Sequence, residues 1–377
     1  MVESERKEHF TESPYFKISI FIITIIFFFS GLYHIQGILI PVVFAALLAM
    51  LILPVTKKLE KVMSQGWAIF ISLLIIIIVI GSFLLLFYYQ IISLADDFPL
   101  IKQKAVDKFS SFQSYIERQF NVPISKQLDW IQSNYDKAVS VGGNFIKSFL
   151  LGFTGGMADF LLVIIYIFFF LLFRIRIKNF ILQLFNREQH PHVNSVIEKI
   201  KSLTIHYMTG LLLEILCLGA LNSIGFLILG VKQAIFFGYL GAVLNLIPYV
   251  GAFIGAVLPM FVAFIYKDTA FYPLAVLGVI FITQFIDNNF LTPMIVGSHI
   301  RINELATIIV IIIGGALWGL TGMILFLPLL GMFKIICDNV DTLKPLGFLV
   351  GEDDKEAEVT GKKENALVRK IKSIFKK

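Results

Sequence analysis

Residues 18–53 read ISIFIITIIFFFSGLYHIQGILIPVVFAALLAMLIL, a run without Asp, Glu, Lys or Arg. A helix that crosses the hydrocarbon of a bilayer needs about 20 apolar residues, so a run of this length nearly suffices for two crossings. Polar or helix-weakening residues lie near its middle, where a tight turn could divide it: Gly31, His34, Gln36, Gly37 and Pro41. We therefore expect two transmembrane helices here. A cleaved signal peptide would have a much shorter apolar core.

The composition of the whole chain also indicates a membrane protein. Hydrophobic residues make up 57% of the 377 residues and charged residues 15%. Soluble proteins carry about 25% charged residues. A soluble enzyme of two α/β domains is therefore excluded, and the lipid bilayer is the expected partner of most of the surface.

Six further apolar runs follow the first stretch. They cover residues 67–94, 153–173, 203–231, 233–266, 271–291 and 305–333. Counted by length, with two spans in the first stretch, the chain has about eight transmembrane helices. Residues that weaken a continuous helix interrupt the fourth of these runs: Pro248, Gly251, Gly255 and Pro259. The expected fold class is an all-α polytopic membrane protein in which Gly and Pro break some helices.

Residues 95–149 are too polar for a span and carry apolar stripes instead. The first stripe consists of Leu94, Phe98, Ile101, Ala105, Phe109, Phe112 and Ile116, and the second of Ile124, Leu128, Ile131, Tyr135 and Ala138. Steps of three and four residues are typical of amphipathic helices. We expect an extracytoplasmic amphipathic helical hairpin, whose first helix begins at Asp96 or Asp97, ahead of Pro99.

Basic residues in short loops orient the spans. They follow the second span and the fourth: Lys57, Lys58, Lys61, Arg174, Arg176, Lys178, Arg187, Lys199 and Lys201. The positive-inside rule makes this side cytoplasmic, and an even number of spans places both termini there. The expected division is a cytoplasmic N-terminus (1–17), transmembrane helices 1–3 (18–94), the extracytoplasmic region (95–149), transmembrane helix 4 (150–177), a cytoplasmic loop (178–202), transmembrane helices 5–8 with two broken segments (203–340) and a cytoplasmic tail (341–377).

The end of the tail is strongly basic. Residues 361–377 hold seven Lys or Arg and one Glu, which accounts for the whole formal net charge of +6. Within it, residues 366–377 place apolar side chains on one helical face with lysines around them, a pattern typical of a basic amphipathic helix on anionic lipid. A frayed solubilising tail is the alternative. So small a basic patch favours lipid headgroups over nucleic acid, and we expect no nucleic-acid partner.

Two acidic residues are candidates for chemistry inside the membrane. Glu214 and Asp287 lie deepest in their apolar runs, whereas Asp159 and His206 lie nearer the ends of spans. Ionisable side chains at this depth are costly and usually face a cavity or a partner. Glu214 and Asp287 are therefore predicted coupling carboxylates for a proton or cation. The alternative is a purely structural role, as protonated carboxyls held by a neighbouring helix.

Two broken segments are the best candidates for a solute or ion site. They read NLIPYVGAFIG over residues 245–255 and QFIDNNFLTP over residues 284–293. Backbone groups freed by Pro and Gly survive in a membrane only where protein or a watery cavity satisfies them, and paired breaks point to a transporter's central site. The predicted binding residues are Asn245, Pro248, Gly251, Gln284, Asp287, Asn288 and Asn289. Kinked helices with polar packing are the alternative interpretation.

Other chemistries find little support in the sequence. His190 and His192 lack acidic or Cys company, so we expect a loop and no metal site. Gly314, Gly315, Gly319 and Gly322 favour close helix packing, because no strand precedes them and no Lys-Ser/Thr follows. There is no nucleotide fingerprint, HExxH or Ser/His/Asp set, and we expect neither a cofactor nor an enzyme.

The two broken segments resemble the signature of the AI-2E (autoinducer-2 exporter-like) family of bacterial membrane proteins. The resemblance rests on residues 244–255, on Gln284, Asp287, Asn288, Asn289 and Pro293, and on the later glycines with Pro328. The polar region after the third span and the spacing of the apolar runs match as well. One departure lies in residues 297–306, which lack the proline of the Leu-His-Pro-like step common in the family.

The resemblance implies a homo-oligomeric secondary transporter of the bacterial cytoplasmic (inner) membrane. Members are linked to export of the quorum-sensing signal autoinducer-2, and others to antiport of Na+ or Li+ against H+. The expected partners are therefore a small polar solute or one of the cations Na+, Li+ and H+. The absence of an ATP-binding sequence favours a gradient-driven mechanism. The alternative is an oligomeric membrane scaffold or channel-like assembly without coupled transport.

Overall fold

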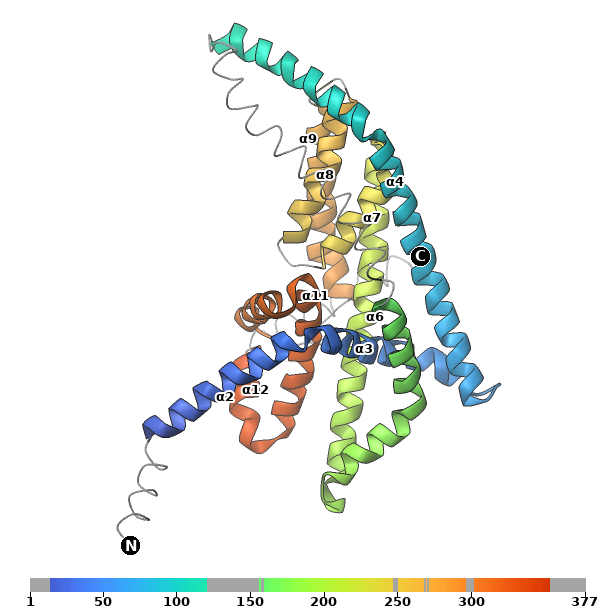
Figure 1. Cartoon of the computed structure of the whole chain (residues 1–377), viewed down its shortest axis with the longest axis vertical. Helices are drawn as coiled ribbons and strands as arrows, with labels where there is room; N and C mark the ends of the chain where they lie inside the picture. Colours follow the sequence, from blue (N-terminus) through green and yellow to red (C-terminus); the bar gives the residue numbers. More distant parts are fainter. Residues whose placement is uncertain are drawn as a thin grey trace, which may run out of the picture.

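The computed structural model describes residues 14–120, 156, 159–246, 250–267, 269, 271–295 and 302–352, and in these ranges the chain is predominantly helical (Figure 1). The helices are α2 (Pro14–His34), α3 (Gln36–Leu59), α4 (Gln65–Phe120), an unlabelled helix Asp159–Gln183, α6 (His190–Ile228), α7 (Ala234–Leu244), α8 (Val250–Tyr266), α9 (Phe271–Ile286), α10 (Thr292–Ile295), α11 (Glu304–Asn339) and α12 (Lys344–Val350). Short turns of other helix types are η1 (Arg187–Gln189), η2 (Asp287–Leu291) and η4 (Asp341–Leu343).

Six of the described helices are long and apolar enough to cross a membrane, and shorter apolar helices accompany them. By length and composition, the candidate spans are Gln36–Leu59, Gln65–Asp97, Asp159–Gln183, Arg187–Ile228, Phe271–Leu291 and Glu304–Asn339, the last of which folds back on itself as described below. The predicted all-α polytopic membrane fold is thus confirmed. The first apolar stretch is interrupted within the predicted region, because α2 ends at His34 and α3 begins at Gln36; α3 is one of the six candidate spans, whereas the apolar part of α2, Ile18–His34, is a shorter apolar helix.

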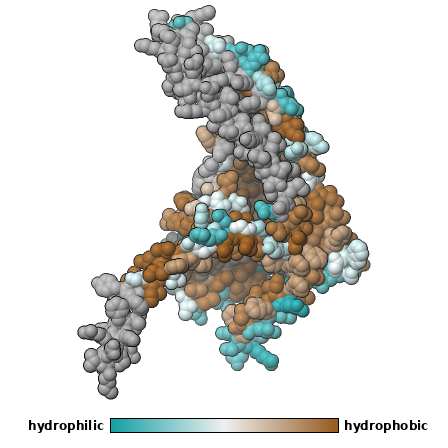
Figure 2. Space-filling view, in the orientation of Figure 1, coloured by the Kyte–Doolittle hydropathy of each residue, from teal (hydrophilic) through white to brown (hydrophobic). Residues whose placement is uncertain are grey.

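Apolar side chains cover much of the outer surface (Figure 2). Phe27, Phe281 and Ile228 are each at least three-quarters exposed. Side chains of this size are stable outside only where lipid or another protein surface covers them. The exposed apolar surface is therefore the expected surface of a membrane-embedded body.

The helix α4 corrects one expectation. It runs without interruption from Gln65 to Phe120 and passes through Asp96, Asp97 and Pro99, so the predicted helix start at these acids is wrong. Pro removes one helical hydrogen bond, but contacts on both sides of it hold the helix in place. Ile101 is buried, and Asp97 pairs with Lys232 at 2.5 Å, which raises the pKa of Lys232.

The extended α4 rises beyond the tops of α8 and α9 in Figure 1. It forms the first arm of the predicted amphipathic hairpin, and Lys108 Nζ donates to the Lys267 carbonyl at 2.6 Å. The second arm, in residues 121–149, lies outside the described residues, as does the basic end of the tail. The predicted loop 178–202 folds largely into the end of the helix Asp159–Gln183 and the start of α6.

The run 233–266, counted above as one span, folds as two antiparallel helices, α7 and α8. Gly230 and Gln233 adopt left-handed conformations (φ 62° and 57°) between α6 and α7, which reverses the chain. The Nζ of Lys232, just before α7, lies 5.0 Å from the centre of the Tyr266 ring at the end of α8. The start of α7 and the end of α8 therefore lie at the same level. We call α7 and α8 together the first hairpin.

The run 305–333 also reverses. Trp318 and Gly319 (φ 60°) leave the helical conformation inside α11. A Cβ built on Gly314 would lie 2.6 Å from the Gly322 carbonyl oxygen, a closeness that a straight helix cannot give residues eight positions apart. The predicted close packing is therefore confirmed for Gly314, Gly315 and Gly322 and occurs between two halves of α11, whereas a Cβ on Gly319 would meet nothing within 4 Å. We call α11 the second hairpin, with its tip at Trp318 and Gly319.

Candidate functional site

Three side chains from the two predicted broken segments lie in hydrogen-bond contact. Asn245 Nδ2 donates to Asp287 Oδ2 at 3.0 Å, and Gln284 Nε2 donates to Asn245 Oδ1 at 3.0 Å. Asp287 is 1% exposed; its Oδ1 meets no hydrogen-bond criterion among the described residues, and the Thr292 side chain lies close to the same carboxyl. A buried carboxyl oxygen without a partner is costly, so this atom marks a place that could receive a proton, a cation or a hydroxyl group.

The depth of this cluster follows from the first hairpin. Asn245 caps the C-terminal end of α7, whose 11 residues span about 16 Å at 1.5 Å per residue. This length is about half of the ~30 Å hydrocarbon thickness. If the base of the hairpin, at Lys232 and Lys267, lies at the membrane surface, the tip with Asn245 ends near the middle of the membrane, where α9 gives way to η2.

A π-helical turn presents Asp287. The residues of η2 follow α9 directly, and the Thr292 amide donates to the Asp287 carbonyl, five residues back. Pro293 has no amide hydrogen, which weakens a regular helix here. Such π-turns are frequent at functional sites because they place an extra residue in the helix and redirect its neighbours.

Glycines make the first hairpin tight enough to form the cluster. A Cβ built on Gly251 would lie 1.7 Å from the Leu244 carbonyl oxygen, and one on Gly255 would lie 2.9 Å from the Gly241 Cα. Neither position has room for a side chain. Gly251 is therefore a structural part of the site, whereas Pro248 lies outside the described residues.

The second candidate carboxylate lies near the first. Glu214 on α6 is half-buried and close enough to Asp287 for the two groups to interact electrostatically. Tyr207 lies two helical turns before Glu214 on α6, is buried, and interacts with Glu214 in the same way. Two acids from distant helices thus lie around one membrane-embedded cluster.

The structure does not bring Asn288 and Asn289 into this cluster. Both are exposed, and Asn289 Nδ2 donates to the Phe285 carbonyl of its own helix at 2.9 Å. Residues next to each other along a helix point in different directions, so proximity to Asp287 in the sequence does not give them the same environment.

Sequence reasoning missed a buried polar pair close to this site. Thr283 Oγ1 donates to Asn222 Oδ1 at 2.6 Å, and both side chains are at most 6% exposed. Asn222 lies eight residues after Glu214 in the apolar run 203–231. Thr283 lies four residues before Asp287 in the run 271–291. These spacings place each pair on one helical face, and this was the available signal.

The change Thr283→Val tests this pair. Valine keeps the shape of threonine but leaves the Asn222 carbonyl oxygen without its donor, so we expect a loss of about 1 kcal/mol of stability. Thermal unfolding of the purified protein measures the loss, and Thr283→Ser, which keeps the hydroxyl, is the matched control. Equal melting of the valine variant and wild type would contradict a role for the bond.

The two histidines of the predicted loop have separate partners. His190 Nε2 lies 3.2 Å from the Phe185 carbonyl, and His192 Nε2 lies 3.0 Å from the Asn339 carbonyl. Within the described part of the chain, no group of three metal-ligating side chains comes together.

Membrane-crossing helices interrupted around a buried polar cluster define a class of protein, the polytopic membrane transporters. The model of a family described as "AI-2E family transporter" matches residues 22–341, and the chain belongs to this family. This is a family of transporters rather than enzymes.

Relatives of known name agree with this class. The chain is 35% identical over 130 residues to a Bacillus subtilis (strain 168) protein named "Putative transport protein YrrI", which covers 34% of this chain and 36% of that protein. It is 22% identical over 343 residues to a Haemophilus influenzae "Putative transport protein", a match that covers 88% of this chain and 95% of that protein. It is 26% identical over 328 residues to the Escherichia coli (strain K12) "Putative permease PerM", a match that covers 83% of this chain and 88% of that protein. The match spans about a third of the YrrI protein's length.

Proposed function

We propose that this protein is a secondary transporter that moves a small polar solute, such as an autoinducer-2-like signal, or exchanges Na+ or Li+ for H+ across the bacterial cytoplasmic membrane. Its binding site consists of Asn245, Gln284 and Asp287, and Glu214 and Asp287 are the coupling carboxylates. The protein works as a homo-oligomer with both termini in the cytoplasm.

The observation that carries the proposal is the buried carboxyl of Asp287. One of its oxygens accepts a hydrogen bond from Asn245, and the other meets no hydrogen-bond criterion among the described residues. Burial of a carboxylate is favourable only with a neutralising proton, cation or polar ligand. A group that must exchange such a partner at mid-membrane depth is suited to coupling transport to an ion gradient.

The amides beside the carboxyl support a polar solute as the second possible cargo. Asn245 and Gln284 place side-chain amides next to Asp287, and amides bind hydroxyl groups through both donors and acceptors. Asn288 and Asn289 stay candidates for solute contact only in a state that brings them closer, because both are exposed here.

Proton flux in liposomes tests the proposal. Purified protein is reconstituted in liposomes that contain a pH-sensitive dye, and Na+, Li+ or K+ is pulsed outside. We expect a proton flux that depends on Na+ or Li+ and is lost in Glu214→Gln. If no ion elicits a flux, labelled polar solutes are tested next, and failure of both would overturn coupled transport in favour of a membrane scaffold.

A further inference from the structure

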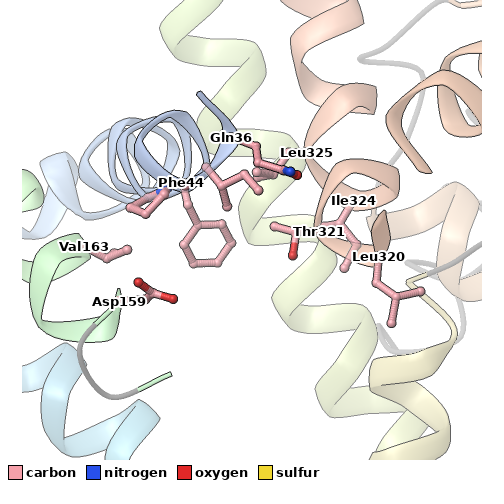
Figure 3. A pocket seen from close by; sticks show the side chains of 11 residues that line it. Gln36, Phe44, Asp159, Val163, Leu320, Thr321, Ile324 and Leu325 are labelled. Carbon is pink, nitrogen blue, oxygen red and sulfur yellow. The ribbon is translucent and has the colours of Figure 1, made fainter. Parts of the chain in front are cut away.

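A second polar site lies apart from the Asp287 cluster, in a cavity between α3, the helix Asp159–Gln183 and α11. The cavity has a volume of about 610 Å³, within the usual range for small-molecule sites, and is partly open. Figure 3 shows the Asp159 carboxyl beside the Phe44 ring, with the Thr321 hydroxyl across the cavity.

The walls of this cavity are mainly apolar. Phe44, Val163 and Leu325 supply much of the apolar surface. Among the described residues that line the cavity, the polar side chains are one carboxylate, one amide and one hydroxyl, from Asp159, Gln36 and Thr321. All three can accept a hydrogen bond, and only the carboxylate carries a charge.

This combination selects among ligands. A carboxylate repels anions, and one carboxylate with two neutral oxygens falls short of the six or more oxygen ligands that Ca²⁺ takes. A positively charged nitrogen with several N–H donors fits the three acceptors, and the apolar walls fit a hydrocarbon body attached to it.

We propose that this cavity binds an amphiphile with a primary ammonium group, whose nitrogen pairs with Asp159 and whose apolar part lies against Phe44, Val163 and Leu325. A free amine and the ammonium end of the phosphatidylethanolamine headgroup both have this chemistry. The inference does not depend on the transport proposal, since none of these residues belongs to the Asp287 cluster.

The position of Thr321 gives the site a structural consequence. Thr321 follows the tip of the second hairpin by two residues, and Trp318 at that tip donates from Nε1 to the Leu32 carbonyl of α2 at 3.1 Å. A ligand that contacts Thr321 on one side and Asp159 on the other therefore holds the hairpin tip against the helix Asp159–Gln183.

Equilibrium dialysis with radiolabelled 1-adamantanamine tests the site. The protein is held in phosphatidylglycerol nanodiscs, and empty nanodiscs correct for partition into lipid. We expect saturable binding, at least tenfold weaker for the uncharged 1-adamantanol, which has the same apolar cage. Asp159→Asn should weaken amine binding at least tenfold, whereas Asp159→Glu and the distant Asp287→Asn should retain it.

A second variant keeps the test decisive if Asp159→Asn does not fold. Gly37 lines the cavity, and a Cβ there meets nothing within 4 Å, so Gly37→Phe should fill the space and abolish binding. Competition by phosphatidylethanolamine added to the nanodiscs would identify the lipid headgroup as the ligand, and lack of competition a free amine. Equal binding of the amine and the alcohol, or unchanged binding in Gly37→Phe, would overturn the proposal.

Discussion

Liposomes that contain the Asp287→Asn protein are expected to show no cation-driven proton flux. Asparagine has nearly the shape of aspartate and can still bond to Asn245, but it cannot exchange a proton or neutralise a cation. Because a buried carboxylate is itself costly, its replacement by a neutral amide should leave the protein folded. The dye assay described above measures the loss, and size-exclusion chromatography verifies the fold.

Two variants make this result specific. Asp287→Glu keeps a carboxyl group and should retain part of the flux. Asp338→Asn makes the same chemical change at an exposed acid that pairs with Lys334 at 2.6 Å, and it should retain the wild-type flux. Normal flux in Asp287→Asn would remove Asp287 from the coupling mechanism.

Replacement of Gly251 by alanine is expected to prevent the first hairpin from closing. The new Cβ would lie 1.7 Å from the Leu244 carbonyl oxygen and 2.6 Å from the Asn245 amide nitrogen, and both are backbone atoms that cannot rotate away. Overpacking of this kind costs about 1–3 kcal/mol where side chains can adjust, so we expect a larger loss here. Thermal unfolding and expression level measure it.

Gly278 in α9 is the matched control, because a Cβ there meets nothing within 4 Å. Gly278→Ala should be neutral or stabilise the helix by about 0.5–1 kcal/mol. If Gly251→Ala and Gly278→Ala unfold at the same temperature, the close approach at the hairpin tip does not control stability.

The sequence predicted the positions of the breaks but not the direction of the chain after them. Asn245 and Gln284 lie in breaks marked by Pro, Gly and amide residues, and the structure brings them together with Asp287. Hydropathy measures how apolar a run is, and 34 apolar residues suit one long helix or two short antiparallel ones. The close approach of Gly251 to Leu244, and the contact of Lys232 with the Tyr266 ring at the other end of the run, decide for two antiparallel helices.

Two further differences between the sequence prediction and the structure have separate causes, a contact distant in sequence in the first case and a local turn in the second. Pro99 signals a helix boundary locally, yet the Asp97–Lys232 ion pair and the buried Ile101 accompany a continuous α4. Asn288 adjoins Asp287 in the sequence but is exposed, since the π-turn directs the two side chains differently.

The two hairpins reverse the sidedness of the segments between them. If each apolar run crossed the bilayer once, Lys267 would lie on the opposite face from Gly230, but a Cβ on Gly230 would lie 2.9 Å from Lys267 Nζ. Asn303 likewise bonds to the Leu349 carbonyl at 2.7 Å, beside the segment that follows α11. Eight crossings, and six crossings with two re-entrant loops, place the C-terminus on the same face of the membrane. A reporter at the C-terminus therefore cannot distinguish these two topologies. Labelling at positions 267 and 303 can distinguish them, because these are the positions whose face of the membrane changes.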